Sequence, residues 1–430
     1  MAMSKARVQR ANRDQFRLEA MDLDGLVAPD HRVRSVWSYV QGLDLSSFYA
    51  AILAREGEPG RAPIDPAILL CLWLYGTLEG IGSARQLALL AEQHHVYRWI
   101  CGGVGVNYHT LSDFRVAHAA FLDRLLTQSL VALMQAGVTS LEEVAQDGLR
   151  TRASAGTGSF RRRATLEAKL AVATERVERL KRELAEEPAA SSRRRKAAQE
   201  RAAREAEERA EAALQHLAEL EKRRLREQKT HKKRAAEREA PRASLSDPEA
   251  RVMRMPDGGF RPAYNLQQAM DVKSGAVVGV MASNSGSDRG QALPMLEQVR
   301  ERSGLWPKRW LADTGYADAD DIQAIANLAE GCVETYIALP AGRDGKPATK
   351  PRHGGPEIQA WRQRMQSSAG EKIYKHRCQA EWVNACMRNR GLRSLWVRGL
   401  AKVQAVLLWH AVAHNFLCLL RHKLIMPVTA

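Results

Sequence analysis

Residues 374–388 decide which fold we expect, and they read Tyr-Lys-His-Arg-Cys-Gln-Ala-Glu-Trp-Val-Asn-Ala-Cys-Met-Arg. Four of these residues, Tyr374, Arg377, Glu381 and Arg388, are separated by 3, 4 and 7 positions. At about 100° per residue, this spacing predicts that all four lie on one side of an α-helix. A carboxylate beside two guanidinium groups suits a metal-bound anion, since carboxylates bind Mg²⁺ and arginines bind phosphate. The alternative is a solvated helix face on which Glu381 pairs with Arg377 or Arg388.

The overall composition indicates a polyanionic partner. The 430 residues include 65 Lys and Arg against 49 Asp and Glu, which gives a net charge of +16, and such a basic balance is typical of nucleic-acid binding. We find no apolar run of about 18 residues and no signal peptide, so we expect a cytoplasmic protein without membrane spans. Six scattered cysteines without a Cys-x-x-Cys pair predict reduced thiols and argue against a zinc site.

Residues 1–140 predict an all-helical domain. Asp65 and Pro66 suit the N-cap and first position of a helix that continues through the apolar run 67–78. Glycine-rich breaks at 80–83 and 102–105 precede a helix start near His109. This succession is similar to a helix-turn-helix arrangement, in which His109, Thr110 and Arg115 would face DNA. An ordinary helical bundle in which Thr110 caps the last helix fits the same residues.

Residues 161–240 are rich in Ala, Glu, Arg, Lys and Leu and contain two heptad seams. The first consists of Leu166, Leu170, Ala173, Val177, Leu180 and Leu184, and the second of Ala203, Ala206, Ala210, Ala213, Leu217 and Leu220. Two seams joined by a Pro/Ser turn predict an inserted antiparallel coiled-coil hairpin. We interpret it as a DNA-contacting arm or a dimer element, while the alternative is a solvated helical spacer.

Two aspartates follow short apolar segments that we predict to be strands. Asp147 ends a segment that contains Val144 and is followed by a glycine, and Asp313 follows the strand-like residues 310–312. Strands at 264–271 and 276–282, a helix at 292–302, a helix starting near Asp318 and a strand at 332–339 complete the predicted order. Each aspartate could instead be an ordinary turn or capping residue.

Three segments together carry a family resemblance. The triplet at 146–148 resembles the first-Asp block of DDE transposases, the segment 312–316 resembles their second-Asp block, and 374–388 resembles the Tyr-Arg-Glu-Lys signature, with Arg388 in place of Lys. Residues 246–253 are similar to the segment that re-enters the catalytic core. The chain therefore resembles a bacterial insertion-sequence DDE transposase with an N-terminal helical transposase domain.

This resemblance implies an α/β protein with an RNase H-like mixed sheet flanked by helices. The core would comprise 141–160 and 241–430, with the hairpin at 161–240 inserted between them. Asp147, Asp313 and Glu381 would bind two Mg²⁺ ions, with Mn²⁺ as a substitute, and Tyr374, Arg377 and Arg388 would contact DNA near the cut.

The implied reaction is nicking at transposon ends followed by joining to target DNA. The implied partners are double-stranded DNA, comprising the terminal inverted repeats and the target, and a second copy of the chain in a homodimer. We expect no membrane partner, no small-molecule substrate, and a location in the bacterial cytoplasm on the nucleoid. The alternatives are a catalytically silent or domesticated DNA-binding protein, a metal-dependent nuclease without strand transfer, and a coiled-coil protein that binds RNA.

Overall fold

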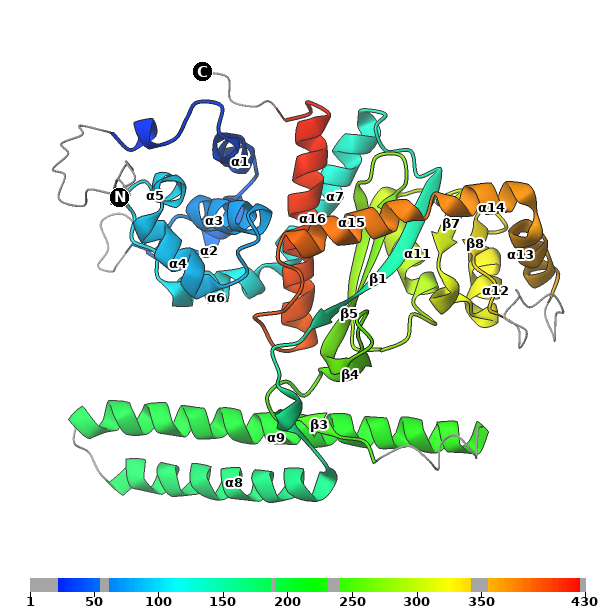
Figure 1. Ribbon diagram of the computed structural model, residues 1–430. Coiled ribbons are helices and arrows are strands. Elements are labelled where there is room, and N and C mark those ends of the chain that lie inside the picture. The colour runs from blue at the N-terminus through cyan, green and yellow to red at the C-terminus, as the bar shows by residue number, and fades with distance from the viewer. Residues whose placement is uncertain (1–21, 55–61, 187–189, 231–239, 342–354, 426–430) are drawn as a thin grey trace, which may run out of the picture.

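The computed structural model describes residues 22–54, 62–186, 190–230, 240–341 and 355–425 (Figure 1). Helices dominate the N-terminal region, a mixed sheet with flanking helices forms the other half, and two long helices lie beside them both (Figure 1). The protein is therefore a mixed α/β protein with a helical N-terminal region, as we predicted from the sequence at this level of detail.

The N-terminal helices surround one completely buried helix, α3. They are α1 (Arg32–Gln41), α2 (Ser46–Ala51), α3 (Pro66–Leu78), α4 (Ala84–Gln93), α5 (His95–Cys101), α6 (Tyr108–Ala117) and α7 (Ala119–Gln135). The Asp65 carboxylate accepts a hydrogen bond from the Ala67 amide at 2.8 Å, and Pro66 occupies the first turn. The predicted start of this helix is confirmed, and its apolar residues explain its burial on every side.

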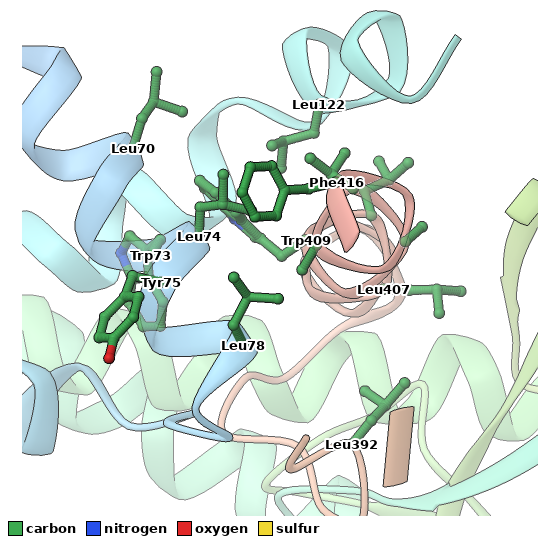
Figure 2. Close-up of a cluster of buried hydrophobic side chains, with 14 of the residues drawn as sticks. Leu70, Trp73, Leu74, Tyr75, Leu78, Leu122, Leu392, Leu407, Trp409 and Phe416 are labelled. Carbon is green, nitrogen blue, oxygen red and sulfur yellow. The ribbon is translucent and has the colours of Figure 1, made fainter. Parts of the chain in front are cut away.

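The C-terminal helix α16 (Leu400–Arg421) joins the helical region to the sheet. It packs against α3, α6 and α7 on one side and against a strand of the sheet on the other. Its Trp409 ring lies 6.5 Å from the Trp73 ring of α3 (Figure 2). Its Phe416 ring lies 5.3 Å from the Tyr39 ring of α1. The N-terminal helices and the sheet therefore share one hydrophobic core.

Helix α16 also corrects one expectation from the sequence. By length and composition it could cross a membrane, and it is the one such helix in the described residues. However, 78% of its apolar stretch is buried inside the protein, as in a core helix. We missed this run because His, Asn and Gln residues interrupt it.

The large sheet combines antiparallel and parallel pairs. Its strands are β1 (Glu143–Arg152), β4 (Arg251–Arg254), β5 (Phe260–Asp271), β6 (Val277–Ser283), β7 (Arg309–Ala312) and β8 (Glu334–Ile337). The order is β4-β5-β1-β7-β8, with β6 also paired to β5. Strand β5 runs antiparallel to β1, β4 and β6, whereas β1, β7 and β8 are parallel. The strands predicted at 264–271, 276–282 and 310–312 are confirmed.

Helices flank this sheet and bring the signature stretch to it. They are α11 (Ala292–Ser303), α12 (Ala319–Leu328), α13 (Pro356–Gln366), α14 (Ser368–Lys375) and α15 (Cys378–Asn389). The prediction of one continuous helix over 374–388 was wrong, because Tyr374 lies in α14 and Arg377 precedes α15. Backbone hydrogen bonds such as Arg377 N to Tyr374 O tighten this junction to i→i−3 spacing.

The inserted segment forms two antiparallel helices, α8 (Arg163–Glu186) and α9 (Ala190–Thr230). Arg163 pairs with Glu221 at 2.5 Å, and Thr174 donates to Glu207 at 2.6 Å, which fixes the antiparallel direction. The short strands β2 (Phe160–Arg161) and β3 (Ala243–Ser244) pair where the insertion leaves and re-enters the core. The buried residues between the helices belong to the predicted seams and are Leu166, Val177, Leu180, Ala203, Ala210, Ala213 and Leu217.

Candidate active site

Asp147 lies inside β1, and Asp313 directly follows the neighbouring parallel strand β7. The prediction that the strand ends at Asp147 was wrong, because β1 continues to Arg152 in its pairing with β5. Strand β1 pairs with β7 in a register that places Ala145 opposite Leu311, and each aspartate follows two residues later. Burial raises the pKa of Asp147 to about 6, and the neighbouring Asp313 carboxylate adds to the rise. Burial also raises the pKa of Asp313. Two partly buried carboxylates that repel each other form a site suited to a cation.

Asn384 of α15 fixes the orientation of Asp147. Its Nδ2 donates to Asp147 Oδ2 at 2.8 Å, and its Oδ1 accepts from Gln268 Nε2 at 2.7 Å. Gln268 is the cross-strand neighbour of Asp147 on β5, so both bonds act on one point of the sheet. Asn384 and Gln268 are buried. Helix α15 is thereby attached to the sheet one turn away from Glu381.

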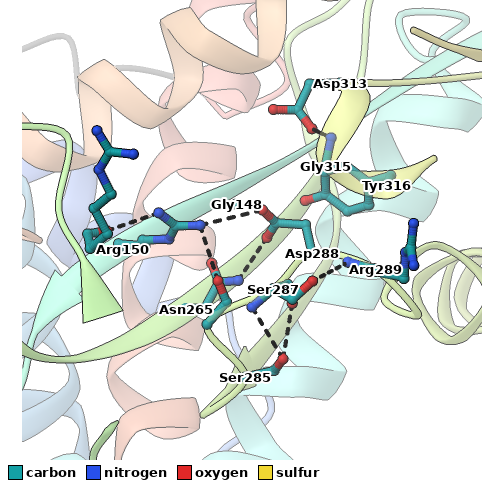
Figure 3. A network of polar contacts seen from close by, with 12 residues as sticks. Gly148, Arg150, Asn265, Ser285, Ser287, Asp288, Arg289, Asp313, Gly315 and Tyr316 are labelled. Carbon is teal, nitrogen blue, oxygen red and sulfur yellow. Dashed lines mark hydrogen bonds and ion pairs between the residues drawn. The ribbon is translucent and has the colours of Figure 1, made fainter. Parts of the chain in front are cut away.

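A third aspartate, Asp288, lies between the two glycines that follow the predicted site residues (Figure 3). Its Oδ1 accepts hydrogen bonds from Asn265 Nδ2 and Gln267 Nε2, both at 2.7 Å. A Cβ on Gly148 would lie 2.6 Å from Asp288 Oδ1, and one on Gly315 would lie 3.2 Å from Asp288 Oδ2. A side chain at position 148 would therefore displace Asp288, and one at position 315 would crowd it. Asp288 also acts electrostatically on Asp313.

Glu381 points toward an arginine rather than toward the two aspartates. Its Oε1 forms an ion pair with Arg377 Nη2 at 2.5 Å, and its side chain is 57% exposed. The Arg377 guanidinium also lies over the Tyr374 ring, 5.6 Å from its centroid, and attracts Asp147 and Asp313. Arg377 thus interacts with all three predicted carboxylates. Its ion pair with Glu381 is the one that the alternative interpretation, a solvated helix face, predicted.

Asp147 and Asp313 have the chemistry of divalent-cation ligands, but the third predicted carboxylate, Glu381, does not join them. Within the residues that the structure describes, no group of three or more His, Cys, Asp or Glu side chains is arranged to hold a metal ion. Asp147 and Asp313 supply hard oxygen ligands in a partly buried position, which is the donor type that Mg²⁺ prefers. Glu381 precedes Asn384 by three residues on α15. It therefore lies on the same side of this helix as the Asn384 side chain that bonds Asp147.

The other predicted site residues divide into exposed and buried positions. His109 is exposed near the start of α6, where the Asn107 side chain caps the helix by accepting from the Thr110 amide at 2.9 Å. Arg115 is buried, lies over the Trp73 ring and donates to Gly82 O at 2.5 Å. The prediction that Arg115 contacts DNA was therefore wrong, because its guanidinium is committed to the core.

Sequence reasoning missed the amides that organise the site. Asn265, Gln267 and Gln268 are polar residues in the buried part of β5, and that combination could have indicated a site. Asn384 lies inside the quoted signature stretch at i+3 from Glu381, but an asparagine on a helix gives no distinct signal of its own. Its role became visible only when α15 was placed against β1.

The structure is thus a mixed α/β protein in which Asp147 of β1 and Asp313 after the parallel strand β7 bring two carboxylates together. Two family models match the chain within this framework: "Transposase domain (DUF772)" at residues 21–117 and "Transposase DDE domain" at residues 343–420. Both matches are to transposase domains, and together they support the resemblance to insertion-sequence DDE transposases seen in the sequence. No curated protein and no solved structure matched the chain.

Proposed function

We propose that this transposase nicks the DNA ends of its own element and joins them to target DNA, with Asp147, Asp313 and Glu381 as the catalytic carboxylates. The observation that carries the proposal is the pair formed by Asp147 and Asp313 on adjacent parallel strands, whose pKa values are both raised. The match to the DDE domain covers Glu381 and supports its inclusion.

The topology supports an RNase H-like core. Strands β6, β5 and β1 are antiparallel neighbours, and β7 and β8 then continue parallel to β1. In this arrangement the first aspartate lies on the central strand and the second follows its parallel neighbour. The helix α15 lies against β1 and β5 and carries the third carboxylate.

Asp147, Asp313 and Glu381 would hold Mg²⁺, or Mn²⁺ as a substitute. Bound divalent ions supply an activated water or 3′-hydroxyl nucleophile and stabilise the leaving oxygen of a phosphodiester. The chain's own residues prepare this site. Asn384 orients one Asp147 oxygen, and Asp288 is held beside Asp313 by two amides. Glu381 must exchange its ion pair with Arg377 to join the two aspartates.

The DNA contacts that we propose near the cut are Tyr374, Arg377 and Arg388. Arg377 and Arg388 would neutralise phosphate charge, while Tyr374 would stack or hydrogen-bond. His109 and Thr110, at the start of α6, are the contacts that we propose for the helical region. The net charge of +16 supports double-stranded DNA as the partner, and we place the protein on the bacterial nucleoid.

A homodimer is part of the same proposal. Helix α9 has 41 residues and α8 has 24, so α9 extends beyond its partner. Val172 and Leu225 expose 62% and 59% of their surface on these helices. Exposed apolar side chains on a long helical pair suit contact with a second copy of the chain.

The test is cleavage of plasmid DNA that carries the element's ends, with Mg²⁺ present, by the wild-type protein and by Glu381→Gln. We expect the variant to lose nicking while it retains DNA binding. Glu371→Gln is the matched control, because Glu371 is an exposed carboxylate of the adjacent α14, paired with Lys375. Nicking by Glu381→Gln at the wild-type rate would remove Glu381 from the site. No nicking by the wild-type protein would favour a silent DNA-binding protein.

A further inference from the structure

A groove of about 570 Å³ opens beside the candidate active site. Its walls come from the end of β1, the turn between β4 and β5, and the chain just after α15. Two of these walls are joined, since Leu395 N donates to Arg152 O at 2.8 Å and Arg152 N donates to Arg393 O at 3.3 Å. The groove is therefore a fixed feature of the core rather than a gap between separate elements.

The groove is strongly basic. Five arginines and one carboxylate line it, and the charged side chains are Arg150, Arg152, Arg261, Arg388, Arg393 and Asp257. The carboxylate of Asp257 is already paired with Arg261 at 2.7 Å. Within the described residues, Arg152, Arg388 and Arg393 form no ion pair. Asp257 attracts Arg152 electrostatically as well as Arg261, so one carboxylate faces five guanidinium groups. Such an excess of positive charge in one concave surface is suited to an anion with several charges.

The groove continues directly from the carboxylates. Arg150 lines it, yet one of its terminal nitrogens also lies 4.0 Å from Asp288 (Figure 3). Strand β1 carries both Asp147 and Arg152, and helix α15 carries both Glu381 and Arg388. At about 1.5 Å per helical residue, Arg388 lies about 10 Å along α15 from Glu381, which corresponds to about three base-pair steps along the axis of B-form DNA.

We propose that this arginine groove binds the phosphates of the DNA strand about three nucleotides from the bond that is cut. The proposal rests on the function proposed above, and it adds Arg152 and Arg393 as phosphate contacts. The occupant is a nucleic-acid backbone, because consecutive phosphates match guanidinium groups spread along a groove, whereas a single small anion would need only one or two of them.

The test is the double variant Arg152→Gln/Arg393→Gln. Its affinity for a duplex of about 30 base pairs with the element's end sequence is measured by fluorescence anisotropy without metal. With about 0.9 counterions released per phosphate contact, two lost contacts weaken binding about thirtyfold at about 0.15 M salt and reduce the salt slope by about 2. Arg300→Gln/Lys308→Gln is the charge-matched control, because neither residue lines the groove.

A second measurement locates the contact on the DNA. Neutral methylphosphonate linkages are placed in turn at each phosphate, and those near the proposed position should weaken binding by the wild-type protein but not by the double variant. If circular dichroism shows both variants to be folded and they bind DNA with equal affinity and equal salt slope, the proposal that the groove binds DNA phosphates is wrong. Neither measurement requires cleavage, so a protein that binds through the groove but never nicks would contradict only the proposed catalysis.

Discussion

Replacing Asn384 by alanine is expected to slow DNA nicking without preventing folding. The change removes the only side-chain donor that the described structure gives to Asp147 Oδ2, a bond of 2.8 Å. It also removes the acceptor of Gln268 Nε2. The first loss acts on the orientation of a catalytic carboxylate, and the second acts on a buried amide between the sheet and α15.

The expected magnitude follows from the two hydrogen bonds. A hydrogen bond to a charged group contributes about 1.5–3 kcal/mol, and at about 1.4 kcal/mol per factor of ten this corresponds to a loss of about 10- to 150-fold in nicking rate. The buried Gln268 amide left without its acceptor is expected to lower the free energy of unfolding by about 1–3 kcal/mol.

The assay is nicking of end-containing plasmid DNA over a Mg²⁺ titration, together with thermal unfolding. Gln298→Ala is the matched control, because the Gln298 amide also accepts one hydrogen bond and donates another, from Val280 N at 2.7 Å and to Val280 O at 3.2 Å. We expect half-saturation at a higher Mg²⁺ concentration for Asn384→Ala and at the wild-type concentration for the control. Equal nicking rates and equal Mg²⁺ half-saturation for the two variants would refute the positioning role.

Two further outcomes follow from the site. The pKa of Asp147 is raised to about 6, so the folded state binds more protons than the unfolded state from about pH 4 to 6 and the free energy of unfolding falls as the pH rises through that range. The Asp147→Asn variant should therefore have a higher free energy of unfolding than the wild type at pH 8, by at most about 3 kcal/mol. Below about pH 4 the two proteins should have the same free energy of unfolding. Identical melting temperatures at pH 8 would contradict this. Gly148→Ala should displace Asp288 and reduce nicking, because its Cβ would lie 2.6 Å from Oδ1, whereas Gly158→Ala meets no atom within 4 Å and should be silent; normal nicking by Gly148→Ala would show that Asp288 is dispensable.

The sequence was sufficient for features that local chemistry determines. Asp65 and Pro66 start α3, Asp318 caps α12, and the turn before β6 uses Gly275 with a φ of 71°. In each case a side chain or a backbone angle acts within a few residues, so the pattern can be recognised without the rest of the fold. The strand before Asp313 was predictable for the same reason, whereas the predicted end at Asp147 was wrong because the pairing with β5 carries β1 on to Arg152.

Long-range packing explains what the sequence did not reveal. Arg115 has the spacing of an exposed contact, but the aromatic core of α3 and α16 encloses it. The break between α14 and α15 has no Gly or Pro to mark it, because i→i−3 hydrogen bonds produce it within ordinary helical angles. The contact of Asn384 with Asp147 joins residues 237 positions apart, and only the placement of α15 on the sheet creates it.

The most direct measurement is a crystal structure of the protein with Mn²⁺ and a short duplex of the element's end, with the ions located by anomalous scattering. We expect Mn²⁺ about 2.0–2.2 Å from oxygens of Asp147 and Asp313, with Glu381 released from Arg377 and facing the ions. Ions bound elsewhere, or Glu381 still paired with Arg377 in a complex that cleaves its DNA, would contradict the central claim that these three carboxylates form the catalytic site.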